Sequence, residues 1–221
     1  MPMQTHALDV YLRGTRNYVQ GSQILGRTSD WLSELDEGAL HLVSAKFSRI
    51  TERGVIAVLD ASDDEIASGK WIGQARYQGA DTVKVVHFGD RDGIGALRIA
   101  DVPSRLTNFR REGRLAGTAT AKHDGSQEAF LASIIETVKR LHADLADDIA
   151  DIWFTGLAQA QLPLSKSCGT EVSISISPLL ERKQDGRLLT LTRVETTKSG
   201  TAIQPFSIGF SCRIKSENKP T

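Results

Sequence analysis

The sequence predicts an α+β protein made of two similar halves, each of them a long helix followed by antiparallel strands. Two segments, 20–35 and 126–146, carry apolar residues at helical spacing, and they begin about a hundred residues apart. Each is followed by runs in which apolar and polar residues alternate. Such a unit folds by wrapping a sheet around its helix, so we predict a tandem repeat. The alternative is one irregular α+β domain whose halves only look alike.

The first predicted helix begins in the stretch NYVQGSQILGRTSDWL, residues 17–32. The apolar residues of this segment share one helical face, namely Ile24, Leu25, Trp31, Leu32 and Leu35. A glycine in a helix interior costs about 1 kcal/mol relative to alanine. Gly21 and Gly26 therefore indicate that some other group approaches the backbone closely.

The strands of the first half are predicted from β-forming runs between turn-like segments. We expect strands in 38–50, in 54–62 and on both sides of the turn at 78–81, with a turn segment at 63–69. A connector follows at 103–122, and its first residues, 103–112, are expected to form a short helix. The predicted division is thus an N-terminal half at 1–102, the connector at 103–122 and a C-terminal half at 123–221.

The second predicted helix has the strongest periodicity in the chain. Its apolar residues at helical spacing are Phe130, Leu131, Ile134, Ile135, Val138, Leu141 and Leu145. Strands are then expected in the alternating runs EVSISISPLLE, GRLLTLTRVETTKSG and TAIQPFSIGFSCRIK. The segments 183–186 and 198–200 have the composition of hairpin turns.

Composition excludes several classes of function. The chain has 27 basic and 27 acidic residues, so no overall field attracts nucleic acid or an anionic membrane. Cys168 and Cys212 are too few and too far apart for a disulfide framework or a zinc signature. No leader pattern and no run of about 18 apolar residues is present. We therefore expect a cytoplasmic protein that uses no metal or cofactor and associates with neither nucleic acid nor membrane.

A central helix cradled by a curved antiparallel sheet, used twice in one chain, resembles the double hot-dog fold. The start of the first helix also resembles that of the leinamycin-type acyltransferase/decarboxylase family. The matching residues are Ser22, Gly26 and the pair Asp30-Trp31, while Asn17 is displaced from the place of the family's asparagine. This resemblance implies an acyl-thioester ligand, carried by coenzyme A or an acyl carrier protein. A double hot-dog needs no partner to pair its helices, so the chain is expected to be a monomer or a homodimer.

The resemblance also implies where the reacting group lies. Hot-dog proteins that act on thioesters place the carbonyl at the N-terminus of the central helix, where unpaired amides and the helix dipole stabilise negative charge. Those amides would be near Gly21, Ser22 and Gln23, and Asn17 would line the same pocket. The family is associated with a tyrosine nucleophile, and Tyr18 is the best-placed tyrosine; the alternative is a tyrosine that only packs at the helix entrance.

Other candidate groups have plainer alternatives. Asp30 is a supporting or basic carboxylate, or it only braces a neighbouring strand. The arginines of the connector, Arg105, Arg110, Arg111 and Arg114, either hold the phosphates of coenzyme A or an acidic carrier protein, or form a solvated surface. Among these we assign Arg110 to the substrate site. The histidines His41 and His87 are expected at strand positions, and His142 on the polar side of the second helix.

Two classes of function remain open from the sequence. One is an enzyme on acyl thioesters in a polyketide-like or acyl pathway, of acyltransferase/decarboxylase, thioesterase or dehydratase type. The other is a non-catalytic hot-dog module that binds an acyl group or a protein partner, because one fold hosts several unrelated roles. An acid, base or nucleophile converging on the N-terminus of the first helix would distinguish the two.

Overall fold

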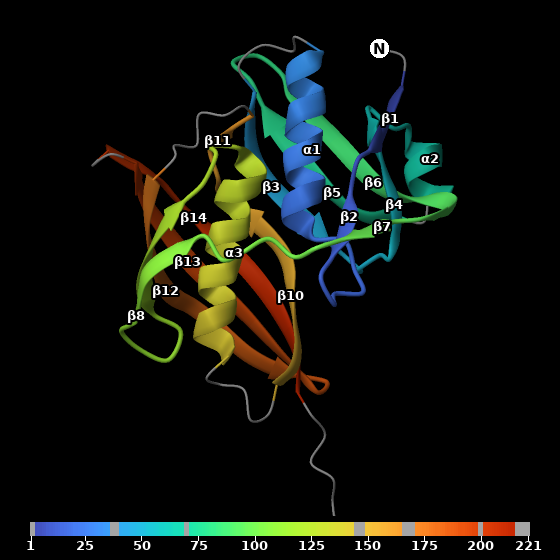
Figure 1. The fold of residues 1–221 in the computed structure, drawn as a ribbon. Helices are drawn as coiled ribbons and strands as arrows, with labels where there is room; N and C mark the ends of the chain where they lie inside the picture. The colour runs from blue at the N-terminus through green and yellow to red at the C-terminus, as the bar shows by residue number, and fades with distance from the viewer. Residues whose placement is uncertain are drawn as a thin grey trace, which may run out of the picture.

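The computed structural model describes residues 3–35, 40–68, 71–143, 149–164, 171–198 and 201–214. Its two long helices are α1 (Gly21–Glu34) and α3 (Gln127–Ala143), each at the position that the sequence predicts. A short helix, α2 (Asp63–Ser68), lies between two strands of the first half. In Figure 1, α1 lies over strands of the first half and α3 over strands of the second half.

The strands of the first half and of the central segment are β1 (Gln4–Leu8), β2 (Tyr11–Arg13), β3 (His41–Phe47), β4 (Arg53–Leu59), β5 (Trp71–Gln78), β6 (Val83–Gly95), β7 (Leu97–Ile99), β8 (Leu106–Arg111) and β9 (Gly117–Lys122). The remaining strands are β10 (Ile149–Ala158), β11 (Leu162–Pro163), β12 (Glu171–Gln184), β13 (Arg187–Lys198) and β14 (Thr201–Ile214). Within the described residues, twelve of them form one sheet in the order β1-β4-β6-β5-β3-β10-β14-β13-β12-β9-β8, with β11 also paired to β3. The parallel pair β2-β7 is separate.

The two halves of the sheet meet at a short seam between β3 and β10. There Gly156 lies opposite Lys46, and Leu157 lies opposite Ala45, in antiparallel register. The sequence predicts one sheet around each helix, whereas the structure joins the strands of both halves into a single sheet. The difference arises because this pairing links residues more than a hundred positions apart, and period-2 patterning predicts strands but not their partners.

Helices α1 and α3 pack against each other in antiparallel orientation. Gly26 of α1 lies so close to Glu128 of α3 that a Cβ atom at position 26 would be 2.5 Å from the Glu128 Cβ and 2.9 Å from its Cα. One turn further along α1, the Ser29 hydroxyl donates a hydrogen bond of 2.5 Å to Gln127 Oε1. The predicted close approach at Gly26 is therefore present, and the approaching group is the backbone of the other helix.

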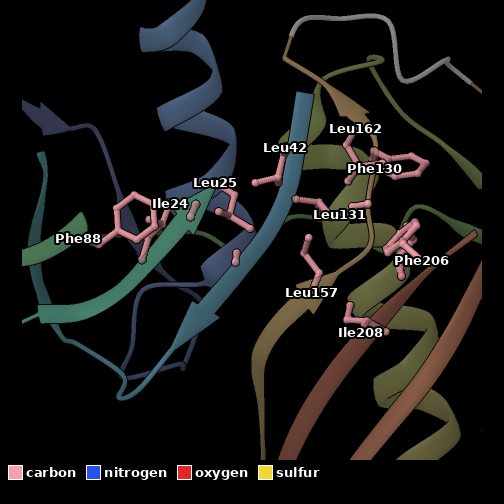
Figure 2. Packing of buried hydrophobic residues seen from close by; sticks show 14 of the residues in the cluster. Ile24, Leu25, Leu42, Phe88, Phe130, Leu131, Leu157, Leu162, Phe206 and Ile208 are labelled. Atoms are coloured by element: carbon pink, nitrogen blue, oxygen red, sulfur yellow. The ribbon is translucent and has the colours of Figure 1, made fainter. Parts of the chain in front are cut away.

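One continuous apolar core lies between the helices and the sheet. The same cluster contains Ile24 and Leu25 of α1, Phe130 and Leu131 of α3, and Leu157 of β10. Figure 2 shows these side chains together with others from both halves. The predicted apolar face of the last strand is buried as well, with Phe206, Ile208, Phe210 and Cys212 no more than 2% exposed.

Replacing Ile134 by alanine should destabilise the protein strongly. The Ile134 side chain on α3 is fully buried (0% exposed). Its truncation is expected to lower the free energy of unfolding by about 2–4 kcal/mol, because transfer energy is lost and a cavity is left. Urea unfolding followed by circular dichroism measures this. Val83→Ala is the control, since Val83 is 46% exposed and should lose less than about 0.5 kcal/mol; equal losses would contradict the assigned core.

Two local predictions are wrong. The segment expected to begin with a short helix at 103–112 contains the strand β8, which pairs with β9, and β9 in turn pairs with β12. Residues 106–122 thus form an edge of the second half's sheet, because strand pairing overrides the local helix signal. The turn expected at 63–69 contains α2, whose start is fixed by reciprocal hydrogen bonds between Ser62 and Glu65.

Of the remaining expectations, one hairpin is confirmed and the position of His142 is wrong. The turn at 183–186 is a hairpin in which Asp185 and Gly186 have positive φ angles of 50° and 71°. At the second hairpin, Lys198 pairs with Thr201, and residues 199–200 lie outside the described residues. His142, expected on a polar face, is fully buried (0% exposed) and contacts Val138 O and Thr190 Oγ1. The division at 102 and 122 remains a prediction.

Candidate functional site

A cavity of about 120 Å³ lies at the N-terminus of α1, where the sequence places the site. It is enclosed by the entrance and first turn of α1, the end of β3 with the loop after it, β10, the middle of α3 and the segment 101–105. Its lining residues are Arg13, Arg16, Tyr18, Val19, Gln20, Gly21, Ser22, Ile24, Phe47, Arg49, Ile50, Thr51, Ile72, Asp101, Val102, Pro103, Arg105, Ala132, Ser133, Ile135, Glu136, Lys139, Trp153 and Phe154. Both halves of the chain therefore contribute to its wall.

Helix α1 begins at this cavity without a side-chain cap. The N-cap residue Gln20 is extended (φ −78°, ψ 137°) and makes no capping hydrogen bond through its side chain. Its carbonyl accepts the first helical bonds, from the amides of Gln23 (3.0 Å) and Ile24 (3.2 Å). The amides of Gly21 and Ser22 precede these bonds, so they are the ones available to a group in the cavity.

Helix α3, unlike α1, begins with a side-chain cap. The Ser126 hydroxyl accepts a hydrogen bond from the Ala129 amide (3.2 Å), which caps the helix. Asp124 in turn accepts hydrogen bonds from the amide and the hydroxyl of Ser126, and the side-chain bond is the main reason why the pKa of Asp124 lies below its ordinary value. Side chains of the protein thus occupy the N-terminus of α3, whereas that of α1 faces a cavity.

Tyr18 and Lys139 form a polar pair in the cavity wall. Lys139 Nζ donates a hydrogen bond of 3.0 Å to the Tyr18 hydroxyl oxygen, and it lies 5.7 Å from the centre of the Tyr18 ring. Tyr18 comes from the segment before α1 and Lys139 from α3, so the pair joins the two halves. A tyrosine hydroxyl that accepts a bond from an ammonium group in the wall of a cavity is a candidate for a reactive or carbonyl-binding group.

The wall of the cavity is more basic than acidic. Five basic side chains line it, against two carboxylates. Both carboxylates have arginine partners: Asp101 accepts two bonds of 2.8 Å from Arg16, and Glu136 accepts one of 2.9 Å from Arg140. Three of the five basic side chains are themselves in ion pairs, Arg13 with Glu128, Arg16 with Asp101 and Arg49 with Asp90. The positive charge offered to a ligand therefore comes mainly from Arg105 and Lys139, and it favours an anionic group such as a phosphate or a carboxylate.

The interior of the cavity is apolar. Val19, Ile24 and Ile72 are no more than 3% exposed, and the rings of Phe47 and Phe154 stand against Gly21. A Cβ atom at position 21 would lie 2.6 Å from Phe154 Cδ1 and 3.0 Å from Phe47 Cε2. The aromatic packing thus already requires a glycine here. A valine at position 21 would therefore collide with the two rings and disturb the wall itself.

The structure brings three of the seven predicted site residues into the cavity wall: Tyr18, Gly21 and Ser22. Gln23 turns away and holds β2, because its side chain accepts a bond from the Tyr11 amide (2.9 Å) and donates one to the Tyr11 carbonyl (3.2 Å). Asn17 accepts a bond of 3.0 Å from Arg98 at the exposed surface. Asn17 and Gln23 thus support the entrance of α1 without lining the cavity.

Asp30 and Arg110 lie outside the cavity wall. The Asp30 side chain is 62% exposed and lies 3.6 Å from Arg27 in an ion pair on the surface of α1. Arg110, on β8, borders a shallow hollow with residues of the neighbouring strands, including Thr118 and Ser173. Of the connector arginines, Arg105 is the one that reaches the cavity.

Sequence reasoning missed the residues that come from far along the chain, above all Lys139 and Phe154. Lys139 is a polar residue in the strongest helical pattern, and its spacing carries no signal of a site. In the described residues, no histidine lines the cavity. Burial lowers the pKa of His87 and raises that of Cys212 to about 12, so neither matches a poised catalytic group at the cavity. Asp36, a further candidate base just after the first predicted helix, lies outside the described residues, and so does Cys168.

Two kinds of feature have no example in the described part of the chain. No group of three or more His, Cys, Asp or Glu side chains there is arranged to hold a metal ion. Among the helices of that part, none is both long enough and apolar enough to cross a membrane.

Comparisons with known proteins identify the fold. Neither models of protein families nor curated proteins give a match to the chain. Among solved structures, the dehydratase domain of RzxB from Pseudomonas fluorescens is similar with a TM-score of 0.57, at 10% identity over 96% of this chain and 94% of that one. A tesB protein from Mycobacterium avium subspecies paratuberculosis is similar with a TM-score of 0.54, at 11% identity over 95% and 92% of the two chains. GphF dehydratase 1 gives a TM-score of 0.52, at 11% identity over 97% and 93%.

These likenesses span almost the whole length of each chain. At such low identity they show the fold alone, which is a hot-dog-like fold with a large antiparallel sheet around a central helix. The predicted hot-dog class is thus confirmed at this level. The resemblance to leinamycin-type proteins in particular has no counterpart among these structures.

Proposed function

We propose that the chain is a double hot-dog protein that binds an acyl thioester in the cavity at the N-terminus of α1 and acts on its carbonyl. The observation that carries this proposal is the uncapped start of α1 at an apolar cavity with a basic wall. An apolar interior suits an acyl chain, and basic groups suit the phosphates of coenzyme A or of a carrier protein's prosthetic arm. The solved structures named for dehydratases and a tesB protein support the same class of substrate.

In this proposal Tyr18 is the nucleophile and Lys139 a positioning residue. The Tyr18 oxygen bonds to the thioester carbon, the carbon–sulfur bond breaks, and the tyrosine proton leaves with the thiol. The amides of Gly21 and Ser22 would donate to the carbonyl oxygen as negative charge develops there. Lys139 holds the Tyr18 hydroxyl through its hydrogen bond of 3.0 Å. The acyl group on Tyr18 then passes to water or to another acceptor.

A non-catalytic acyl-binding module is the second candidate. It is favoured by the state of the two carboxylates in the cavity wall, since Asp101 and Glu136 are both engaged by arginines. Because an arginine engages each of these two carboxylates, neither is offered to a ligand as a general base. In this candidate Tyr18 only holds the ligand.

Incubation with a panel of acyl-coenzyme A and acyl-pantetheine compounds distinguishes the two candidates. Mass spectrometry follows both the release of thiol and the mass of the intact protein. The enzyme proposal expects thiol release above the rate without protein, and an adduct of acyl mass on the peptide that contains Tyr18. Saturable binding without thiol release supports the binding module instead. If the protein neither bound nor cleaved any of the compounds, both candidates would be contradicted.

A further inference from the structure

Two phenylalanine rings form a wall of the cavity beside the start of α1, and this pair, Phe47 and Phe154, is called the end wall. Phe47 is the last residue of β3 and Phe154 belongs to β10, so they lie beside the seam where the two halves of the sheet join. Their ring centres are 5.7 Å apart, and both rings line the cavity. Because they come from different halves, this end wall exists only when the two halves are joined.

Each of these rings is backed by a buried ring of its own half. Phe47 stacks on Phe88, with ring centres 5.9 Å apart, and Phe88 is 0% exposed. Phe154 meets Phe210 edge-on at 6.0 Å, and Phe210 is 1% exposed. Phe47 and Phe154 therefore separate the cavity from the two cores, and neither ring can move inward without displacing a core ring.

The backbone of α1 closes the third side. Gly21 touches both rings, since a Cβ atom at that position would lie within 3.0 Å of each. The rings therefore cannot turn toward the helix either. The end wall is thus packed against Phe88, Phe210 and the backbone of α1, and it lies next to the amides that we assign to the thioester carbonyl.

The space in front of this wall is small. The cavity measures about 120 Å³. One water molecule needs about 10–15 Å³ in the same measure, so the cavity admits roughly ten groups of that size. An acyl chain whose carbonyl lies at the start of α1 would meet the wall after a few carbon atoms.

We propose that the Phe47–Phe154 pair limits the length of the acyl chain, so that the site selects short acyl thioesters. This inference rests on the proposed function. An aromatic wall excludes a longer chain because the chain would have to displace packed rings. Within the permitted length, each further methylene gains binding energy by leaving water.

The test is the affinity for straight acyl-coenzyme A compounds from two to twelve carbons, measured by isothermal titration calorimetry. For the wild type we expect affinity to rise over the first few carbons and then to fall. Phe154→Ala should move the maximum to longer chains and raise the affinity for the longer compounds by roughly 10-fold or more. Phe154→Leu is the milder variant if the alanine protein folds poorly, and it should move the maximum in the same direction by fewer carbons.

Two further variants make the result specific. Ala132→Leu adds volume on the α3 wall of the cavity and should move the maximum to shorter chains. Phe206→Leu removes a similar volume from the core, where Phe206 is 2% exposed and does not line the cavity, so the maximum should stay where it is. Thermal unfolding checks that all variants are folded.

The outcomes are distinguishable. An unchanged chain-length profile in the folded Phe154 variants would overturn the limit set by the two rings, while binding by the wild type would leave the proposed function standing. A wild-type affinity that does not fall with increasing acyl-chain length would also overturn the limit set by the two rings. If no acyl-coenzyme A of any length bound the wild type, the proposed function would fail, and this inference would fail with it.

Discussion

Tyr18→Phe is expected to abolish acyl transfer to the protein and to lower kcat for thioester cleavage by about 10³-fold or more. The change removes only the hydroxyl oxygen, which accepts a hydrogen bond of 3.0 Å from Lys139 at the cavity. The ring remains, so the free energy of unfolding should fall by less than about 1 kcal/mol. Steady-state kinetics, intact-protein mass spectrometry and urea unfolding measure these three effects.

Lys139→Met and its control Lys122→Met complete the experiment. Lys139→Met removes the group that positions the Tyr18 hydroxyl, so kcat should fall by about 10- to 100-fold while the adduct still forms slowly. Lys122, at the end of β9, is also a lysine, but its side chain is 67% exposed, pairs with Glu171 and does not line the cavity. Lys122→Met should therefore leave kcat within about twofold. Full activity in folded Tyr18→Phe protein would show that Tyr18 only packs at the helix entrance.

The second large effect is expected at the seam of the sheet, from Gly156→Ala. Gly156 has a φ of 153°, and a Cβ atom there would lie 2.1 Å from the carbonyl oxygen of Ala45 on β3. Because the added Cβ atom would collide with a backbone atom, it could be accommodated only if β3 and β10 moved apart. We expect a loss of about 3 kcal/mol or more in the free energy of unfolding, or failure to fold. Urea unfolding measures the loss in the soluble fraction.

Gly89→Ala is the matched control for the seam. Gly89 is also a glycine in the sheet, but a Cβ atom there would have its nearest contact at 3.5 Å, with Ile56. Alanine at this position should change stability by less than about 1 kcal/mol in either direction. If Gly156→Ala were as stable as Gly89→Ala, the two halves would not be joined in the way that the structure shows.

The helices could be predicted because their signal is local. The apolar residues of 20–35 and 126–146 recur at helical spacing, and most of those between 127 and 143 are buried in the structure. Period-2 alternation similarly located the strands that contain Val172 and Phe206. These patterns depend only on neighbours in the chain, which a sequence displays directly.

Pairing between distant strands could not be predicted in the same way. The seam of β3 with β10 rests on Gly156, whose positive φ and close approach to Ala45 become visible only in the structure. Similarly, the arginine-rich segment after Pro103 carries helix signals, but pairing with β9 makes it a strand. In both places the tertiary partner decides the local conformation.

The candidate site could be predicted in part. A cavity lies at the glycine-bearing helix entrance that the sequence singles out, and Tyr18, Gly21 and Ser22 line it. The reason for Gly21 is nevertheless packing against Phe154, a contact between the halves that no spacing predicts. Lys139 was missed for the same reason, since its partner Tyr18 lies 121 positions away in the sequence.

The central claim is that an acyl thioester binds at the N-terminus of α1, and a crystal structure with a bound analogue tests it most directly. The ligand is a butyryl-coenzyme A analogue in which a methylene group replaces the sulfur, so that it cannot be cleaved. We predict its carbonyl oxygen within hydrogen-bond distance of the Gly21 or Ser22 amide, its chain toward Phe47 and Phe154, and its phosphates toward the basic side chains of the wall. An analogue bound elsewhere, with this cavity empty, would contradict the account.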